Sequence, residues 1–188
     1  MTVTETPLAG VLLVEPRVFG DARGFFCETY QADRYAEAGI PARFVQDNVS
    51  RSGRGTLRGL HFQAPPHAQA KLVSCLDGAV FDVAVDLRAG SPTYGQWFGA
   101  ELTAENMHQM FVPAGFAHGF VVTSETALFS YKVSGLYAPH AEGSLAWDDP
   151  DVGVRWPVEV PVLSDKDRAA PRLADLATPF VAGAPLPS

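Results

Sequence analysis

The stretch AVFDVAVDL, residues 79–87, sets the fold class of this chain because its side chains alternate in character along the backbone. Successive side chains of a β-strand point to opposite faces of a sheet, so a period of two is typical of a strand. The large apolar residues from Phe81 to Leu87 share one face, and Asp82 and Asp86 lie on the other. The stretch therefore predicts a β-strand with one apolar face.

Further stretches of the same kind are separated by turns such as Asp77-Gly78 and Gly90-Ser91-Pro92. Many short strands at a spacing of roughly 8–12 residues indicate a mainly β protein, an antiparallel sandwich or barrel. Short helices are predicted only at 33–38, as a single turn at 103–106, and at 165–169. The other predicted strands are residues 10–15, 24–30, 44–50, 71–76, 96–102, 108–113, 118–123 and 127–134.

One domain, residues 1–188, accounts for the whole chain, because no linker, repeat or low-complexity block divides it. A hydrophobic content of 47% with 19% charged residues is typical of a globular protein. From about residue 150 the chain is rich in proline and aperiodic, and we expect this segment to wrap over the body.

Charge and cysteine content limit the classes of partner and compartment. A net charge of −7 disfavours binding to nucleic acid or to an anionic membrane. Cys27 and Cys75 are isolated thiols, the first residues show no secretory signal, and no apolar run is long enough to span a membrane. These features together predict a soluble, cytoplasmic protein.

The stretch GTLRGLHFQ, residues 55–63, reads as a strand that carries Arg58 and His61 among apolar neighbours. Polar groups in a half-buried strand must be paired or solvated, and such local exceptions tend to mark functional sites. A surface strand with one hydrogen-bonded histidine is the simpler alternative. Because their separation is odd, Arg58 and His61 face one pocket only if the strand bends, and we expect the bend at Gly59.

Two kinds of chemistry are open to His61. A metal site in a β-barrel needs three or four converging ligands, but Gln63 follows where a second ligand is wanted, and the cation of Lys71 repels a metal. We therefore expect no metal. Proton transfer needs an acidic partner that orients the imidazole ring, and Asp165 and Asp167 are the candidates near the end of the chain.

Tyr131 and a group of basic residues extend the set of candidates. Tyr131 is either a core tyrosine with a hydrogen-bonded hydroxyl or a phenol that donates a proton. The densest basic region, from Arg51 to Arg58 together with Lys71, suits a phosphate or diphosphate. Neither a glycine-rich phosphate loop nor a dinucleotide-binding motif occurs, so the sequence disfavours a nucleoside triphosphatase or a dinucleotide cofactor.

A colinear series of motifs covers the chain from about Leu8 to Arg168. The motifs are RGFFCE (23–28), FVQDN (44–48), LRGLH (57–61), PAGFAHGF (113–120), YK (131–132), WDDP (147–150) and LSDKD (163–167). In this order and spacing they resemble the dTDP-4-dehydrorhamnose 3,5-epimerase family. So many spaced motifs form a far more specific signal than any one of them.

The resemblance implies a cupin-type antiparallel jelly roll without metal or cofactor, assembled as a homodimer that exchanges N-terminal strands. The implied reaction inverts C3 and C5 of dTDP-4-dehydro-6-deoxy-D-glucose and gives dTDP-4-dehydro-L-rhamnose. By position, His61 is similar to the catalytic base, Tyr131 to the acid, and Asp167 to the residue behind the base, while Lys71 can stabilise the enolate. The positions implied to contact the substrate are Arg23, Phe26, Glu28, Gln46, Asn48, Arg58, Lys71, His118, Tyr137 (stacked on the thymine), Glu142 and Lys166.

Three departures from the family pattern bear on the substrate. Gly135-Leu136 precedes Tyr137 where many relatives carry an acidic or amide residue and an aromatic one. Asp148 follows the tryptophan in place of asparagine, and Cys27 replaces a bulkier residue. The first departure can change how the base and the sugar sit. A 3-epimerase of a related dTDP-keto sugar, a non-catalytic cupin that binds a nucleotide sugar, and a metal-dependent cupin enzyme are therefore the alternatives.

Overall fold

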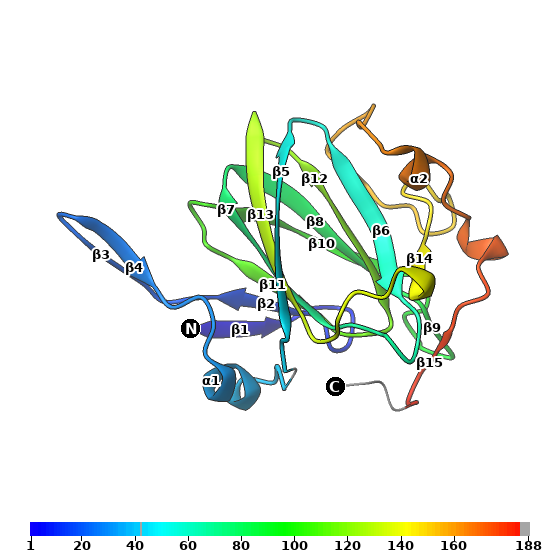
Figure 1. Cartoon of the computed structure of the whole chain (residues 1–188), viewed down its shortest axis with the longest axis horizontal. Helices are drawn as coiled ribbons and strands as arrows, with labels where there is room; N and C mark the ends of the chain where they lie inside the picture. The colour runs from blue at the N-terminus through cyan, green and yellow to red at the C-terminus, as the bar shows by residue number, and fades with distance from the viewer. Residues whose placement is uncertain (42, 185–188) are drawn as a thin grey trace.

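The computed structural model of the chain describes residues 1–41 and 43–184, and in it two antiparallel β-sheets pack face to face as a sandwich (Figure 1). This arrangement confirms the predicted antiparallel, mainly β fold. The first sheet contains, in spatial order, β1 (Thr2–Glu5), β2 (Leu12–Glu15), β11 (Gln109–Val112), β7 (Lys71–Asp77), β13 (Thr126–Val133) and β5 (Gln46–Gly53). The second contains β10 (Trp97–Thr103), β8 (Ala79–Asp86), β12 (Phe116–Val122), β6 (Leu57–Gln63) and β14 (Glu142–Ser144).

The remaining elements are short. At 103–106 the structure has a hydrogen-bonded turn in place of the predicted helical turn, and Thr103 Oγ1 accepts from the backbone N–H of Asn106 at 2.9 Å. The strands β1 and β3 lie outside the stretches that alternation predicted. The smaller elements are the hairpin β3 (Val18–Asp21) and β4 (Gly24–Cys27), the parallel pair β9 (Arg88–Ala89) and β15 (Phe180–Val181), the helices α1 (Ala32–Glu37) and α2 (Asp165–Arg168), and the 3₁₀ turns η1 (Pro139–Ala141) and η2 (Leu173–Asp175).

The strand β8 is buried on both of its faces. Val83 packs outward with residues of the C-terminal segment such as Phe180, and Val80 packs inward between the two sheets. The predicted division of side chains between faces is correct, but the face that carries Asp82 and Asp86 is the interior one. Both aspartates are 0% exposed, so each buried carboxylate needs partners inside the protein.

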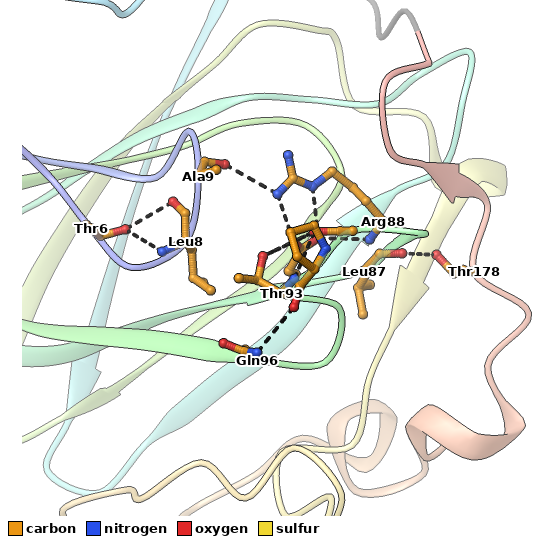
Figure 2. A network of polar contacts seen from close by, with 11 residues as sticks. Thr6, Leu8, Ala9, Leu87, Arg88, Thr93, Gln96 and Thr178 are labelled. Atoms are coloured by element: carbon orange, nitrogen blue, oxygen red, sulfur yellow. Dashed lines mark hydrogen bonds and ion pairs between the residues drawn. The ribbon is translucent and has the colours of Figure 1, made fainter.

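Asp86 has its partners in a network at the end of β8, and Figure 2 shows two of them, Arg88 and Thr93. Its carboxylate accepts hydrogen bonds from Arg88 at 2.8 and 2.9 Å, from Ser91 at 2.6 Å and from Thr93 at 2.7 Å. Burial alone raises the pKa of Asp86, but these hydrogen bonds outweigh it and hold the pKa below its ordinary value. Arg88 also donates to the Ala9 carbonyl at 3.3 Å, so the network joins the N-terminal loop to the sheet.

The chain beyond β14 covers the outer face of the five-stranded sheet (Figure 1). Backbone hydrogen bonds from Leu57 to Val162 at 3.0 Å and from Val162 to Gly55 at 2.8 Å attach this segment to the start of β6. It thereby brings α2 against the strand that carries His61. In the described ranges, none of the helices has the length and apolar character of a membrane span.

The β3–β4 hairpin projects away from the sandwich (Figure 1). Phe19, Phe25 and Phe26 are 50%, 64% and 68% exposed on it. Large apolar side chains exposed together usually mark an interaction surface, because their hydration is unfavourable.

Candidate active site

A cavity of about 660 Å³ lies between the two sheets and is closed on one side by the segment that leads into α2. Polar residues from β5, β6, β7, β12 and β13 line it together with apolar ones. Most of the residues that the sequence placed in a site meet here: Gln46, Asn48, Arg58, His61, Lys71, His118, Tyr131, Tyr137, Glu142, Lys166 and Asp167.

The predicted bend in β6 is confirmed. The pairing of β6 with β12 changes register between His118 and Phe120, and Gly59 has a φ of +138° beside a cis peptide bond to Leu60. A Cβ atom at Gly59 would lie 2.6 Å from the Cα of Gly119, so no larger residue fits. Arg58 and His61 consequently line the same cavity despite their odd separation.

His61 and Asp167 form a hydrogen-bonded pair. Nε2 of His61 lies 2.5 Å from Oδ1 of Asp167, with side-chain exposures of 29% and 5%. Burial raises the pKa of Asp167, but the hydrogen bonds from His61 and Ser164 outweigh it, and the pKa lies below the ordinary value. Because an ionised carboxylate only accepts, Nε2 carries the hydrogen and Nδ1 is the basic nitrogen of the neutral ring.

Ser164 orients Asp167, and the sequence did not single it out. Its hydroxyl donates to Oδ2 of Asp167 at 2.8 Å and accepts from the Asp167 backbone N–H at 3.1 Å, as the N-cap of α2. A serine three residues before an aspartate at a helix start is the available sequence signal. The cap holds the buried Asp167, and Asp167, not Asp165, is the residue that pairs with His61.

Tyr131 comes from β13, in the sheet opposite the one that carries His61. Burial raises the pKa of its phenol, while the positive charge of Arg58 partly opposes the increase. The phenol therefore remains protonated at neutral pH and can donate a proton. A basic nitrogen on one wall of the cavity and a phenol on the other is an arrangement suited to moving protons on the two sides of one ligand.

The rim of the cavity combines an aromatic side chain with charged ones. Tyr137 is 53% exposed, and its hydroxyl donates to Glu142 at 3.0 Å. Its backbone N–H donates to Gln46 at 3.2 Å, and Lys166 forms an ion pair with Glu142. Gln46 in turn donates to Asn48 at 3.0 Å. The rim thus offers a ring face and a cation to a ligand that extends out of the cavity.

Three of the residues implied to contact substrate lie outside the cavity of this chain. Arg23 and Phe26 belong to the projecting β3–β4 hairpin, and Glu28 follows it directly. Arg23 pairs with Asp21 at 2.5 Å within the hairpin, and Glu28 pairs with Arg34 of α1. Within a single chain these three do not join the site.

In the parts of the chain that the structure describes, no group of three or more His, Cys, Asp or Glu side chains is arranged to hold a metal ion. The histidines away from the cavity include His67 and His140, which stack edge to face at 4.9 Å between ring centroids.

Comparison with known proteins identifies the family of the chain. A family model described as dTDP-4-dehydrorhamnose 3,5-epimerase matches residues 5–175. A relative of that name from Pseudomonas aeruginosa is 55% identical over 177 residues, which cover 93% of this chain and 97% of the relative. A dTDP-4-dehydrorhamnose 3-epimerase from Streptomyces niveus is 44% identical over 169 residues, which cover 89% of this chain and 82% of that protein.

Among solved structures, a dTDP-6-deoxy-D-glucose-3,5-epimerase from Legionella pneumophila in complex with dTDP-4-keto-L-rhamnose has a TM-score of 0.90 at 50% identity. The match covers 93% of this chain and 94% of that one. The family model and these relatives each span nearly the whole chain. This chain therefore belongs to the dTDP-4-dehydrorhamnose 3,5-epimerase family.

Proposed function

We propose that this protein inverts C3 and C5 of dTDP-4-dehydro-6-deoxy-D-glucose and gives dTDP-4-dehydro-L-rhamnose. The observation that carries the proposal is the His61–Asp167 pair on one wall of the cavity with Tyr131 on the opposite wall. A carbon centre is inverted when one side of the sugar loses a proton and the other side gains one, and this site has a group for each step.

The first half of the reaction is removal of a proton from carbon. C3 and C5 both flank the C4 ketone, so loss of either proton gives an enolate whose negative charge rests on the C4 oxygen. Nδ1 of His61 accepts the proton, and the Asp167 carboxylate stabilises the imidazolium that forms. The cations of Lys71 and Arg58, which line the same cavity, stabilise the enolate oxygen.

The second half is return of a proton from the other face. The Tyr131 hydroxyl donates its proton to the carbon, the enolate collapses to the ketone, and the phenolate stays beside the cation of Arg58. His61 then holds the proton that left the carbon. Exchange with water returns both residues to their starting forms, and the same cycle follows at the second carbon.

The nucleotide half of the substrate fits the rim. The exposed ring of Tyr137 offers a face for the thymine, and Arg58 and Lys166 offer cations for the diphosphate. Gln46, Asn48, His118 and Glu142 complete the proposed contacts. The overall charge of −7 repels an anionic ligand. The local cations counteract this repulsion at the site, so an anionic diphosphate can bind there although the protein as a whole is acidic.

We also propose that the protein works as a homodimer in which the β3–β4 hairpin of one subunit reaches the cavity of the other. The exposed phenylalanines of the hairpin and the position of Arg23, Phe26 and Glu28 outside their own cavity support this.

The reduced thiols of Cys27 and Cys75 are compatible with action in the cytoplasm.

A mixing experiment tests the exchanged hairpin. Arg23→Ala and His61→Asn chains are each expected to be inactive as homodimers. After joint refolding, half of the dimers contain one chain of each kind, and one of their two sites has both residues intact, so activity should return to about a quarter of the wild-type value. Mixtures that stay inactive although the chains are dimeric by sedimentation would show that Arg23 does not serve the partner's site.

The configuration of the product separates the proposed reaction from its alternatives. We expect the wild-type protein to convert dTDP-4-dehydro-6-deoxy-D-glucose into a sugar inverted at both C3 and C5, as read by proton NMR couplings after reduction of the ketone. Inversion at C3 alone would assign the protein as a 3-epimerase, an activity suggested by the relative from Streptomyces niveus. Binding without conversion would identify a non-catalytic protein.

A further inference from the structure

Asp82 is a buried carboxylate that the steps described above do not use. It is 0% exposed on the interior face of β8, where its neighbours along the strand, Val80 and Ala84, belong to the apolar core. It does not line the cavity, whereas His118 and Lys71 do. Asp82 therefore lies behind the wall of the cavity, whereas His118 and Lys71 can contact a substrate.

The His118 ring is fixed by this carboxylate. Nε2 of His118 lies 3.0 Å from each of the two oxygens of Asp82, and the His118 side chain is 7% exposed. Burial lowers the pKa of His118, and the negative charge of Asp82 opposes that effect. A neutral ring whose Nε2–H donates to Asp82 is the form that costs least in this buried position.

Lys71 faces the same interior from the other sheet, because Val73, on its face of β7, belongs to the same core cluster as Val80 and Ala84, and Lys71 lines the cavity together with His118. Its Nζ donates to the backbone carbonyl of His61 at 3.3 Å. Burial lowers the pKa of Lys71 to about 8, against the opposing charges of Asp82 and, less strongly, Glu142. Burial raises the pKa of Asp82, while His118 and Lys71 favour its ionised form. The negative charge of Asp82 and the positive charge of Lys71 thus each favour the ionised form of the other residue, in a buried site where water stabilises neither charge.

We propose that Asp82 is a positioning residue for the epimerisation: from behind the cavity wall it fixes the His118 ring and keeps Lys71 a cation where the enolate charge develops. The inference rests on the proposed function, because it assigns a purpose to this cluster only if an enolate forms. Asp82 thereby serves Lys71 and His118 as Asp167 serves His61. A buried lysine without this counter-charge loses its proton more readily and is then unable to stabilise an anion.

The other charged groups around Lys71 do not replace Asp82. Glu142, from β14, is engaged by Lys166 and by the Tyr137 hydroxyl at the rim. His61, from β6, presents its carbonyl to Lys71 and its ring to Asp167. Arg58 adds a positive charge to the cavity wall near Tyr131. Removal of the negative charge of Asp82 is therefore expected to lower the pKa of Lys71.

The test is the pH profile of kcat for Asp82→Asn, which keeps the size of the side chain and an oxygen for His118 but removes the charge. Its alkaline limb, where Lys71 deprotonates, should move by about one pH unit toward acid. On that limb kcat should fall by about tenfold at a given pH, with a loss of about twofold at neutral pH and little change in KM.

Asp86→Asn is the matched control. Asp86 lies on the same face of the same strand with the same exposure of 0%, but its partners Arg88, Ser91 and Thr93 do not line the cavity. This variant should lower the melting temperature without moving the pH profile. Lys71→Arg gives a second test that keeps Asp82 intact, because a guanidinium stays charged and the alkaline limb assigned to Lys71 should disappear.

The outcomes separate the inference from the function on which it rests. If the wild-type protein is active and Asp82→Asn keeps the wild-type alkaline limb, or loses kcat equally at every pH, Asp82 is not the positioning residue. A Lys71→Arg variant that keeps the limb contradicts the inference even if Asp82→Asn does not fold. A wild-type protein that leaves the dTDP-keto sugar unchanged removes the proposed function instead.

Discussion

Replacing His61 with asparagine is expected to lower kcat by about 10³- to 10⁴-fold, because the base is lost at both carbons. Asparagine is neutral and smaller than the imidazole ring, so the substrate keeps its room and its other contacts, although the amide does not reach Asp167 as Nε2 does. The loss should therefore appear in kcat and not in KM. It should also abolish exchange of the C3 and C5 hydrogens with D2O, which mass spectrometry of recovered substrate measures directly.

His67→Asn is the matched control for this change. His67 lies outside the cavity and stacks on His140, so the same substitution there should leave kcat unchanged. A His61→Asn protein that is folded by circular dichroism and still exchanges both hydrogens at the wild-type rate would show that another group is the base.

Replacing Tyr131 with phenylalanine should have a comparable effect on inversion but not on exchange. The ring stays in place and only the hydroxyl is removed, so the opposite face of the sugar loses its proton donor. We expect inversion to slow by about 10²- to 10⁴-fold. His61 can still remove a proton and return one to the same face, so the substrate should take up deuterium while it keeps its configuration.

The control for Tyr131→Phe is Tyr94→Phe, which removes a hydroxyl from a ring that is 37% exposed and away from the cavity. It should change neither exchange nor inversion. Equal loss of both processes in Tyr131→Phe would contradict the division of roles, because it would mean that the phenol is needed before the enolate forms.

The fold class was accessible from sequence because strand alternation is local. The period of two in residues 79–87 correctly placed Asp82 and Asp86 on one face of a strand. It did not indicate that this face is interior, because a charged side chain that faces water and one that faces a buried partner give the same pattern. That distinction depends on partners such as His118, which lies 36 residues from Asp82 in sequence and meets it only in the folded chain.

The site was accessible in part for the same reason. The odd spacing of Arg58 and His61 required a bend, and glycine at position 59 supplied the place for it. The partner of His61 could not be chosen between Asp165 and Asp167 by spacing, because the pairing joins residues 106 apart in sequence and depends on how the chain places α2 against β6. The resemblance of motifs, and not periodicity, named Asp167.

The hairpin residues illustrate a different limit. Arg23, Phe26 and Glu28 were assigned to the site by resemblance alone, and a single chain keeps them outside its cavity. These residues serve a site only if a second subunit brings its cavity to the hairpin. Neither the alternation nor the spacing of residues within one chain shows where a second subunit lies. Their place in the proposed dimer therefore stays a prediction until the mixing experiment is done.

The central claim is that two groups on opposite walls of one cavity exchange protons at both carbons next to the ketone. The most direct measurement is the deuterium content of the product that wild-type protein forms from dTDP-4-dehydro-6-deoxy-D-glucose in D2O, counted by mass spectrometry and located by NMR. We expect one deuterium at C3 and one at C5 of an inverted sugar. Product inverted at both carbons but without deuterium at them would contradict the account.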